Sequence, residues 1–376
     1  MNDVGERITV AIVFGGRSSE HEISCSTAAG VLAAIDRERF DVIPIGITRD
    51  GAVTLQSDDP AAFRMDPNAM PVVPDNGTRI VWPESAATRE LSVRDPDGAV
   101  RSLGTLDVAF PILHGPWGED GTIQGLFELV GLPYVGSGVL ASALGMDKHV
   151  AKVVLDGAGV PVAPWVALTP EEWASDEASA RAGAARLGLP VFVKPARAGS
   201  SVGVTKVGSW DDLESALRVA WAEDAKALVE GAIVGREIEC GVLQGRAGRA
   251  PRVSLPGEIV MRTREFYDYE AKYLDPDAAE LVCPTALGAD ELLEMQRIAV
   301  RVFEAIGCAG LARVDLFLTD SGFVVNELNT MPGFTPISMF PKCWEASGIG
   351  YRELITELVE LALEGRATVG RGLSPR

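Results

Sequence analysis

Short apolar runs that end in glycine-rich or charged loops are the feature of this sequence that most restricts its fold. The run ITVAIVFGG at 8–16 enters a glycine pair, and the segment 24–35 behind it has the periodicity of a helix. Runs at 40–47 and 106–115 have the length of buried strands, and a helical pattern at 121–132 follows the second of them. Strands that alternate with helices predict a mostly parallel α/β sheet covered on both faces.

A different pattern begins in the middle of the chain. Thr169, Pro170 and Glu172 provide an N-cap, a proline at the first helical position and a capping-box acid, which predicts a helix to about residue 187. The strand-like LPVFVKP follows this helix, and Ser209 introduces a second predicted helix. These elements indicate a small α+β unit.

Three domains are therefore expected. The first is a parallel α/β domain at 1–146 with weakly periodic excursions at 51–105, the second is the α+β unit at 147–229, and the third is another α+β unit at 230–376. The third domain contains a long helix from Asp290. One face of this helix is apolar and consists of Leu292, Met295, Ala299, Val302, Phe303 and Ile306.

Composition excludes several classes of protein. The chain has 376 residues, 47% of them hydrophobic, which suffices for two or three domain cores. Its net charge of −19 opposes generic binding to nucleic acid or to anionic lipid. The five cysteines are scattered without a CxxC pair, and no apolar run is long enough to span a membrane. We therefore expect a cytoplasmic protein without a disulfide framework or a zinc cluster.

Two strand-like segments surround the tripeptide Asp-Ser-Gly at 320–322. A three-residue hairpin loop with glycine in the left-handed position would pair residue 319 with residue 323. In that register Asp315 lies opposite Glu327. A slip of one residue would move one carboxylate to the other face, so the register decides whether the two acids meet.

The same register sets Arg313 opposite Asn329, so four polar side chains share one face of the hairpin. Two carboxylates and an amide on a rigid ribbon suit magnesium, which prefers hard oxygen ligands. An exposed hairpin face with an ion pair to Arg313 is the alternative interpretation. Five apolar residues are expected on the opposite face: Val314, Leu316, Leu318, Val324 and Leu328.

Several loops carry further polar groups. The segment KPARAGSSVGV at 194–204 places small residues after a strand that ends in a lysine, and its backbone NH groups could cradle phosphate or simply connect a hairpin. The glycine-flanked loops 15–24 and 114–125 each contain a histidine at the carboxyl end of a predicted parallel strand, where open α/β sheets bind ligands. Each histidine could instead satisfy the backbone of a turn.

The segment EFYDYEAKYLD at 265–275 is dense in aromatic and charged residues. This composition is typical of a lid over a site, or of a surface loop whose aromatic rings pack downward. The G-x-G-x-x-G fingerprint is missing around the glycine pair at 15–16, which disfavours a dinucleotide site in the first domain.

Several of these segments occur in an order that resembles the D-alanine–D-alanine ligase family of the ATP-grasp superfamily. The similarity runs from about Val10 to Leu361 and rests on GGRSSEHEIS, HGPWGEDGTIQG, YVGSGVLASALGMDK, KPARAGSSVGV, YDYEAKY, ARVD and NELNTMPGFTP. It implies an ATP-grasp fold and the ATP-dependent joining of two D-alanine molecules through a D-alanyl phosphate. ADP and phosphate would be released, and the dipeptide would serve peptidoglycan precursor synthesis. Nothing is transferred to segment 51–105, which is longer than in compact members.

The resemblance also implies an ATP site. Lys148 and Lys194 would contact the phosphates, Glu230 would hold the adenine amino group, and Glu237 would hold the ribose. Ala232 departs from the bulky aromatic residue that many relatives carry beside adenine. The implied ATP-binding set is Lys148, Lys194, Ser201, Glu230, Ile233, Glu237, Asn326 and Lys272, the last at the transferring phosphate.

For the amino acids, the resemblance implies that Glu20 holds the ammonium of the first D-alanine, with His114 nearby. Ser338 would receive the carboxylate of the second D-alanine. Arg313 and the backbone NH of Gly333 would form the oxyanion site.

A hydrogen-bonded set of Glu119, Ser200 and Tyr273 would tie a lid at 262–283 to the small-residue loop. A homodimer with its contact in the first domain is implied as well, with small molecules as the other partners. Three residues would bind two magnesium ions, for which manganese can substitute: Asp315, Glu327 and Asn329.

Three rival interpretations were weighed against this one. A ligase that takes D-lactate or D-serine second would keep the same scaffold, but Tyr273 favours D-alanine because depsipeptide-forming relatives tend to alter the lid. A non-catalytic nucleotide-binding module is disfavoured by the presence of Arg313, the metal ligands and both phosphate lysines. A nicotinamide-dependent oxidoreductase lacks its glycine fingerprint.

Overall fold

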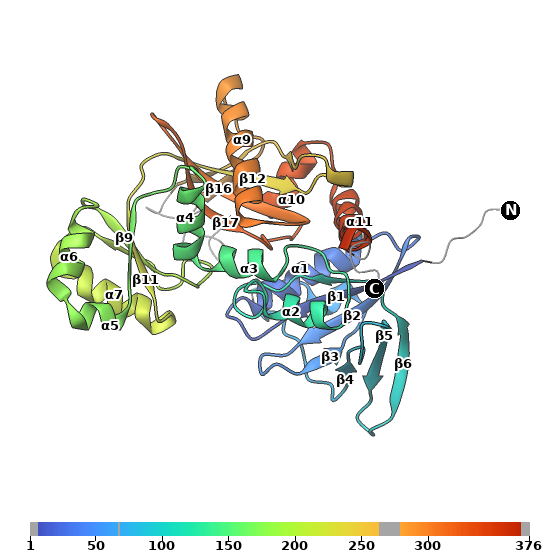
Figure 1. Ribbon diagram of the computed structural model, residues 1–376. Helices are drawn as coiled ribbons and strands as arrows, with labels where there is room; N and C mark the ends of the chain where they lie inside the picture. Colours follow the sequence, from blue (N-terminus) through green and yellow to red (C-terminus); the bar gives the residue numbers. More distant parts are fainter. Residues whose placement is uncertain (1–6, 67, 263–278, 370–376) are drawn as a thin grey trace, which may run out of the picture.

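The computed structural model describes residues 7–66, 68–262 and 279–369 (Figure 1). Its first sheet has the strand order β3–β2–β1–β7, in which β1 pairs in parallel with β2 and β7 while β3 is antiparallel to β2. The strands are β1 (Ile8–Gly15), β2 (Phe40–Ile47), β3 (Val53–Leu55) and β7 (Val108–Pro111).

Both faces of this sheet are covered, as the alternation of strands and helices predicts. The even-numbered residues of β1 from Val10 to Phe14 point into a core shared with α1 (His21–Ala34) and α11 (Tyr351–Val369). The odd-numbered residues between them point into a second core that contains α2 (Thr122–Leu129). A parallel strand with both faces buried is apolar throughout, which explains the uninterrupted run at the start of the sequence.

The excursions at 51–105 include a small sheet that the sequence did not predict. The 3-10 turn η1 (Pro60–Phe63) precedes three antiparallel strands in the order β4–β5–β6. The strands are β4 (Arg79–Val81), β5 (Glu90–Arg94) and β6 (Val100–Thr105). Leu91 and Val93 are fully buried on one face of β5. Each strand shows too few apolar alternations for the pattern to stand out between prolines and aspartates.

The second sheet is antiparallel, with the order β10–β9–β11–β8, and it lies at the left of Figure 1. Its strands are β8 (Trp165–Leu168), β9 (Val191–Pro195), β10 (Thr205–Val207) and β11 (Ala227–Gly231). The capping box at Thr169 forms as predicted. However, the single helix expected behind it is divided into α5 (Pro170–Ser175) and α6 (Glu177–Ala185), because Asp176 ends the first and caps the second. Helix α7 (Leu213–Glu223) packs against β9.

The third sheet has the order β15–β14–β12–β16–β17, and β13 pairs with β12. Its strands are β12 (Arg236–Leu243), β13 (Arg252–Val253), β14 (Gly257–Met261), β15 (Ala279–Val282), β16 (Leu311–Thr319) and β17 (Gly322–Asn329). Helix α9 (Ala289–Ile306) packs on one face together with α4 (Lys148–Gly157). The predicted apolar face of α9 is confirmed, with Leu292 at the edge of the core and the other five residues buried.

The hairpin of β16 and β17 has the predicted polar register but a different turn. Asp315 lies opposite Glu327, and the arginine–asparagine pair beside it also forms. The loop was predicted wrongly, because Thr319 pairs with Gly322 across two residues rather than three. A β-bulge on β17 with Asn326 as the extra residue restores the register before the acids are reached.

The bulge changes which residues form the apolar face. Val324 is half-buried and lies outside the core, contrary to the prediction, whereas Phe323 and Val325 are buried within it. The extra residue shifts the alternation by one position between the loop and the bulge, so that every side chain in that stretch exchanges faces. The other four predicted positions belong to the core or its edge: Val314, Leu316, Leu318 and Leu328.

Two more helices, α3 (Val139–Met146) and α10 (Met339–Ala346), flank the third sheet. In the part of the chain that the structure describes, no helix has the length and apolarity needed to cross a membrane. Strand β11 ends at Gly231, so the second sheet continues two residues past the predicted domain boundary at 229. The division into three domains stays a prediction.

Candidate active site

A cavity of about 770 Å³ is bounded by residues of the second and third sheets, by α1 and the loop after β7, and by the loop that precedes α10. Lys272 and Tyr273 lie outside the described residues, as does most of the lid expected at 262–283. All the other predicted site residues line the cavity: Glu20, His114, Glu119, Lys148, Lys194, Ser200, Ser201, Glu230, Ile233, Glu237, Arg313, Asp315, Asn326, Glu327, Asn329, Gly333 and Ser338.

Three carboxylates lie side by side on the cavity face of the third sheet, and we call them the carboxylate row. Glu239 of β12 pairs with Asp315 of β16, which pairs in turn with Glu327 of β17. Side chains at paired positions of neighbouring strands are roughly 5 Å apart at Cβ, so the three negative charges are close. The sequence analysis missed Glu239, although it lies two residues from Glu237 and so on the same face of the strand.

Arg313 offsets part of this charge. Its Nε and one terminal nitrogen donate to the two oxygens of Asp315 at 2.7 Å each, and Nε lies 3.2 Å from Glu239 Oε2. Burial lowers the pKa of Arg313, but the charges of Asp315 and Glu239 outweigh it and hold that pKa well above the ordinary value. Lys148 Nζ lies 3.9 Å from Glu327 Oε2. Among the described residues, Arg313 and Lys148 are thus cations that lie beside the carboxylate row.

The carboxylate and amide oxygens on this face are hard donors, which suit a divalent cation such as magnesium. Within residues 7–66, 68–262 and 279–369, no three acidic, histidine or cysteine side chains are close enough to enclose a metal ion. Asp315 is held by Arg313 and by Asn329, whose Nδ2 donates to Asp315 Oδ2 at 2.9 Å. A carboxylate has about four acceptor sites and these hydrogen bonds use three of them, so Asp315 can bind a cation while Arg313 holds it.

Two lysines share one glutamate in the part of the cavity that we call the lysine end. Glu230 of β11 is 5% exposed and forms ion pairs with Lys194 of β9 and with Lys152 of α4. Burial raises the pKa of Glu230, but the two lysines outweigh burial and lower it below the ordinary value. Lys148 lies one helical turn before Lys152 and donates to the carbonyl oxygen of Ala198 at 2.6 Å. The spacing of four was a signal for Lys152 that the sequence analysis overlooked.

Apolar side chains line the lysine end as well. Phe192 lies opposite Glu230 in the second sheet, and Phe317 lies opposite Glu237 in the third. Both phenylalanines line the cavity together with Ile233. Flat apolar walls with a few polar groups are typical of a site that holds a planar ring. Neither phenylalanine was identified from the sequence. The face of the sheet on which each lies depends on the pairing of strands that are distant in the sequence.

Another part of the cavity, the α1 end, is built around Glu20, the residue before α1. Ser200 Oγ donates to Glu20 Oε1, although 180 positions separate the two residues. A Cβ atom on Gly199 would lie 2.7 Å from Glu20 Oε2, and one on Gly115 would lie 3.0 Å from it, so a larger residue at either position would displace the Glu20 carboxylate. Ser200 and Ser201 have φ angles of 50° and 59°, a left-handed conformation that is strained for serine and typical of functional loops.

Two family models match this chain. The N-terminal model of D-ala D-ala ligase matches residues 9–137, and the C-terminal model matches residues 154–360. A D-alanine–D-alanine ligase from Kineococcus radiotolerans is 53% identical over 362 residues, with 94% of this chain and 96% of that protein covered. The chain belongs to the D-alanine–D-alanine ligase family.

Solved structures of ligases share its fold. The VanG D-Ala:D-Ser ligase from Enterococcus faecalis has a TM-score of 0.81 and 34% identity, with 95% of this chain and 100% of that chain covered. A D-alanine–D-alanine ligase from Bacillus anthracis complexed with ATP has a TM-score of 0.69 and 25% identity, with 96% and 100% covered. The predicted ATP-grasp fold is thereby confirmed for this member of the ligase family.

Glu119 and Ser200 of this ligase-family chain have different hydrogen-bond partners among the described residues. Its Oε2 accepts from the NH of Gly115 at 2.6 Å and its Oε1 from the NH of Met331 at 3.3 Å, while Ser200 donates to Glu20 instead. Tyr273 lies outside the described residues, so the expected set of three stays a prediction, and among the described residues Ser200 bonds to Glu20. Burial, together with the charge of Glu20, raises the pKa of Glu119 to about 8.

The two loop histidines differ in position. His114 lines the cavity with its Nδ1 3.2 Å from the carbonyl oxygen of Met331, and burial lowers its pKa. His21 is fully buried away from the cavity, with Nδ1 2.6 Å from the oxygen of Gly16 and Nε2 accepting from the NH of Val73 at 3.0 Å. His21 is thus the turn histidine of the alternative interpretation, and it ties the excursions to the glycine turn of the ligase fold.

The loop before α10 carries the last expected residues. Ser338 Oγ lies 2.7 Å from Thr335 Oγ1 and accepts from the NH of Thr335 at 3.2 Å. A Cβ atom on Gly333 would lie 3.3 Å from Ser338 Oγ, so the two residues are close neighbours in the cavity wall. The expected oxyanion residues and the expected second-substrate serine thus border the same space in this ligase-family chain.

Proposed function

We propose that this chain joins two D-alanine molecules to D-alanyl-D-alanine, with ATP converted to ADP and phosphate, for peptidoglycan precursor synthesis. The observation that carries the proposal is that one cavity contains lysines, a carboxylate row with Arg313, and the buried Glu20. These groups match a triphosphate, its divalent cations and an ammonium group in turn. The names of the relatives and the ATP complex of the Bacillus anthracis ligase support the same assignment.

At the lysine end, Lys148 and Lys194 hold the ATP phosphates and the apolar walls hold the adenine ring. Glu230 accepts from the adenine amino group and Glu237 from the ribose, while Lys272 reaches the transferring phosphate. Two magnesium ions, or manganese in their place, offset the charge between the γ-phosphate and the attacking carboxylate when they are bound. The proposed metal ligands are Asp315, Glu327 and Asn329.

At the α1 end, Glu20 holds the ammonium of the first D-alanine, whose carboxylate attacks the γ-phosphorus. The bond from this phosphorus to the β,γ-bridging oxygen breaks, so ADP leaves and an acyl phosphate forms. The amine of the second D-alanine, bound through its carboxylate at Ser338, then attacks the carbonyl carbon. Arg313 and the NH of Gly333 donate to the oxyanion of the tetrahedral intermediate, and one such donor contributes about 3 to 4 kcal/mol. Phosphate leaves, and the peptide bond remains.

We also propose a cytoplasmic homodimer with its contact in the N-terminal domain. All five cysteines are free thiols, as a reducing compartment favours. The dimer follows from the family resemblance, and light scattering coupled to size-exclusion chromatography would test it. A monomer at micromolar concentration would contradict this part of the proposal.

Product identification tests the proposed function. The purified protein is incubated with ATP, magnesium and an equimolar mixture of D-alanine, D-serine and D-lactate, and the products are identified by mass spectrometry. D-Alanyl-D-alanine is expected as the main product. D-Serine is included because the Enterococcus faecalis relative is a D-Ala:D-Ser ligase. A product that contains D-serine or D-lactate in place of the second D-alanine would reject the assignment, and so would the absence of ATP turnover.

A further inference from the structure

Lys152 is a buried cation that the proposed reaction does not use. Its side chain is 3% exposed, it forms an ion pair with Glu230, and its Nζ lies 5.9 Å from the ring centre of Trp165. Among the described residues, Glu230 and Lys194 line the cavity but Lys152 does not. Lys152 therefore does not line the ligand space itself, and Glu230 is the cavity residue with which it forms an ion pair.

Glu230 has two cationic partners, and one of them has another task. Lys194 lies in the cavity wall and, under the proposed function, turns to the ATP phosphates. Lys152 is then the remaining partner of a carboxylate that is 5% exposed. A buried carboxylate without a cation is unfavourable and tends to take up a proton. The ion pair with Lys152 prevents this.

We propose that Lys152 is a positioning residue that keeps Glu230 ionised and aimed at the purine ring, and that it thereby makes the site select adenine. This inference rests on the proposed function. An ionised Glu230 accepts a hydrogen bond from the 6-amino group of adenine and repels the 6-oxo group of hypoxanthine. A protonated Glu230 would donate to the 6-oxo group, and the distinction between the two bases would fall.

ATP and ITP are suitable probes, because they carry the same triphosphate and differ at position 6 of the purine. The ratio of kcat/KM for ATP to that for ITP is measured with D-alanine by phosphate release. The wild type is expected to favour ATP. Lys152→Met removes the charge at similar volume and is expected to lower this ratio about 10- to 100-fold, which corresponds to the loss of one charged hydrogen bond. The loss should lie mainly in the KM for ATP, with little change in kcat.

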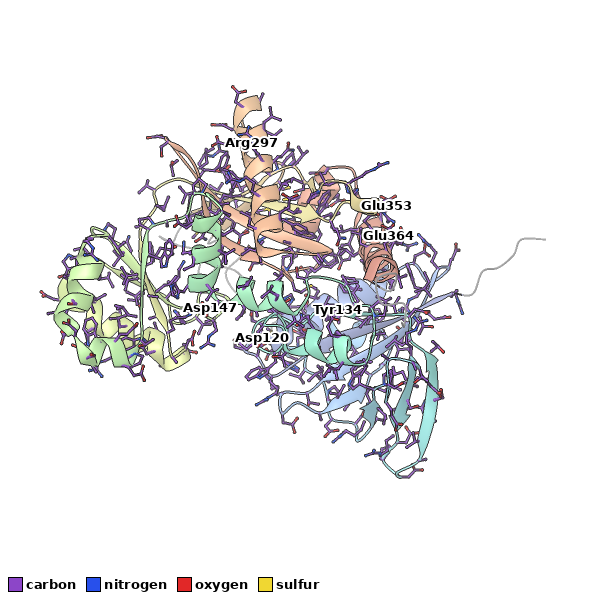
Figure 2. The ribbon with its side chains drawn as sticks, in the orientation of Figure 1. Asp120, Tyr134, Asp147, Arg297, Glu353 and Glu364 are labelled. Atoms are coloured by element: carbon purple, nitrogen blue, oxygen red, sulfur yellow. The ribbon has the colours of Figure 1, made fainter. Side chains whose placement is uncertain are left out.

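Lys226→Met provides a matched control. Lys226 donates to Asp147 at 2.7 Å at the start of the same helix, where Figure 2 labels Asp147, and it lies outside the cavity wall. This variant loses one lysine ion pair near Lys152 and should keep the wild-type ratio of ATP to ITP. Lys152→Arg keeps the charge and should restore part of the ratio.

A double-mutant cycle separates an action through Glu230 from an independent one. Glu230→Gln can both donate and accept, so it should lower the ratio by itself. Adding Lys152→Met to Glu230→Gln should then lower the ratio no further, whereas additive losses would overturn the proposal.

The remaining outcomes separate this inference from the proposed function. A wild-type protein without D-alanine-dependent turnover of ATP would defeat the proposed function first. An active wild type that does not distinguish ATP from ITP, or a folded Lys152→Met variant with the wild-type ratio, would overturn the role of Lys152 alone. If Lys152→Met shows no cooperative thermal transition, the variant is unfolded and the ATP-to-ITP ratio of Glu230→Gln is the deciding measurement. An unchanged ratio in that variant overturns the proposal.

Discussion

The two ends of the cavity hold their charges in different ways. At the lysine end, Glu230 is compensated by ion pairs with Lys152 and Lys194. At the α1 end, Glu20 and Glu119 accept hydrogen bonds from a serine hydroxyl and from backbone NH groups, and no ion pair to either is found among the described residues. The lysine end must therefore exchange one of its partners for an anionic ligand, whereas the α1 end is prepared for a cation.

This contrast explains the unusual titration of Glu119. Two carboxylates that share a low-dielectric region without a cation cannot both ionise easily, so one of them keeps its proton. Burial and the charge of Glu20 raise the pKa of Glu119 to about 8. At the lysine end, the two lysines instead lower the pKa of Glu230 despite its burial.

Removing one charge from the carboxylate row between these groups should have the largest effect. Glu327→Gln is expected to lower kcat about a thousandfold, because a neutral amide weakens the hold on a divalent cation that offsets the transferring charge. Phosphate release at saturating ATP, magnesium and D-alanine measures the effect. Asp320→Asn, in the exposed loop of the same hairpin, should keep the wild-type rate. A Glu327→Gln variant with the wild-type kcat would show that the carboxylate row takes no part in the mechanism.

Neutralising Glu20 at the α1 end should weaken the binding of D-alanine without changing the binding of ATP. Glu20→Gln is expected to raise the KM for the first D-alanine about 10- to 100-fold, because the ammonium loses one charged hydrogen bond. The KM for ATP should stay unchanged. Initial rates over a grid of both substrate concentrations give the two constants. Glu22→Gln, which loses an ion pair with Arg49 in the first turn of α1, is the control. An increase in the KM for ATP alone would contradict the contrast between the ends.

Loss of the serine bridge should have a smaller effect. Ser200→Ala removes the hydroxyl that donates to Glu20 and should raise the KM for D-alanine by about tenfold or less, since one uncharged donor is lost. Ser215→Ala, on the exposed side of α7, should behave as wild type. Equal D-alanine KM values for the two variants would show that the bridge does not orient Glu20.

The pH dependence of stability should show the smallest change. The pKa of Glu119 is about 8 in the folded protein against 4.5 ordinarily, so the folded state binds an extra proton between these values and loses stability as pH rises through them. Glu119→Gln cannot ionise, so its stability should decline less from pH 5 to pH 8. Urea unfolding at several pH values measures this slope. A variant with the wild-type slope would show that Glu119 is ionised in the folded protein.

The sequence predicted those parts of the site that depend on neighbouring residues. Asp315 was placed opposite Glu327 within one hairpin, but the pairing came out as predicted only because the bulge at Asn326 offsets a loop that is one residue shorter than expected. The capping box at Thr169 and the apolar face of α9 were local patterns. Such features follow from spacing alone.

Features that depend on contacts between distant segments were not predicted. Glu239 joins the carboxylate row only because β12 pairs with β16, and the sequence does not state that pairing. Ser200 reaches Glu20 across 180 positions through two left-handed residues, neither of them a glycine that would have marked the turn. Lys152 was discoverable from its helical spacing, but its partner on β11 was not.

The bulge at Asn326 makes the tip of the hairpin independent of its polar end. The extra residue absorbs the offset between a two-residue loop and the pairing of Asp315 with Glu327. Residues 320–321 are exposed and lie on the far side of the bulge from the carboxylates. The exposed tip is thus a natural attachment point for a fluorophore or an affinity label, through which the protein could be followed or immobilised while it works.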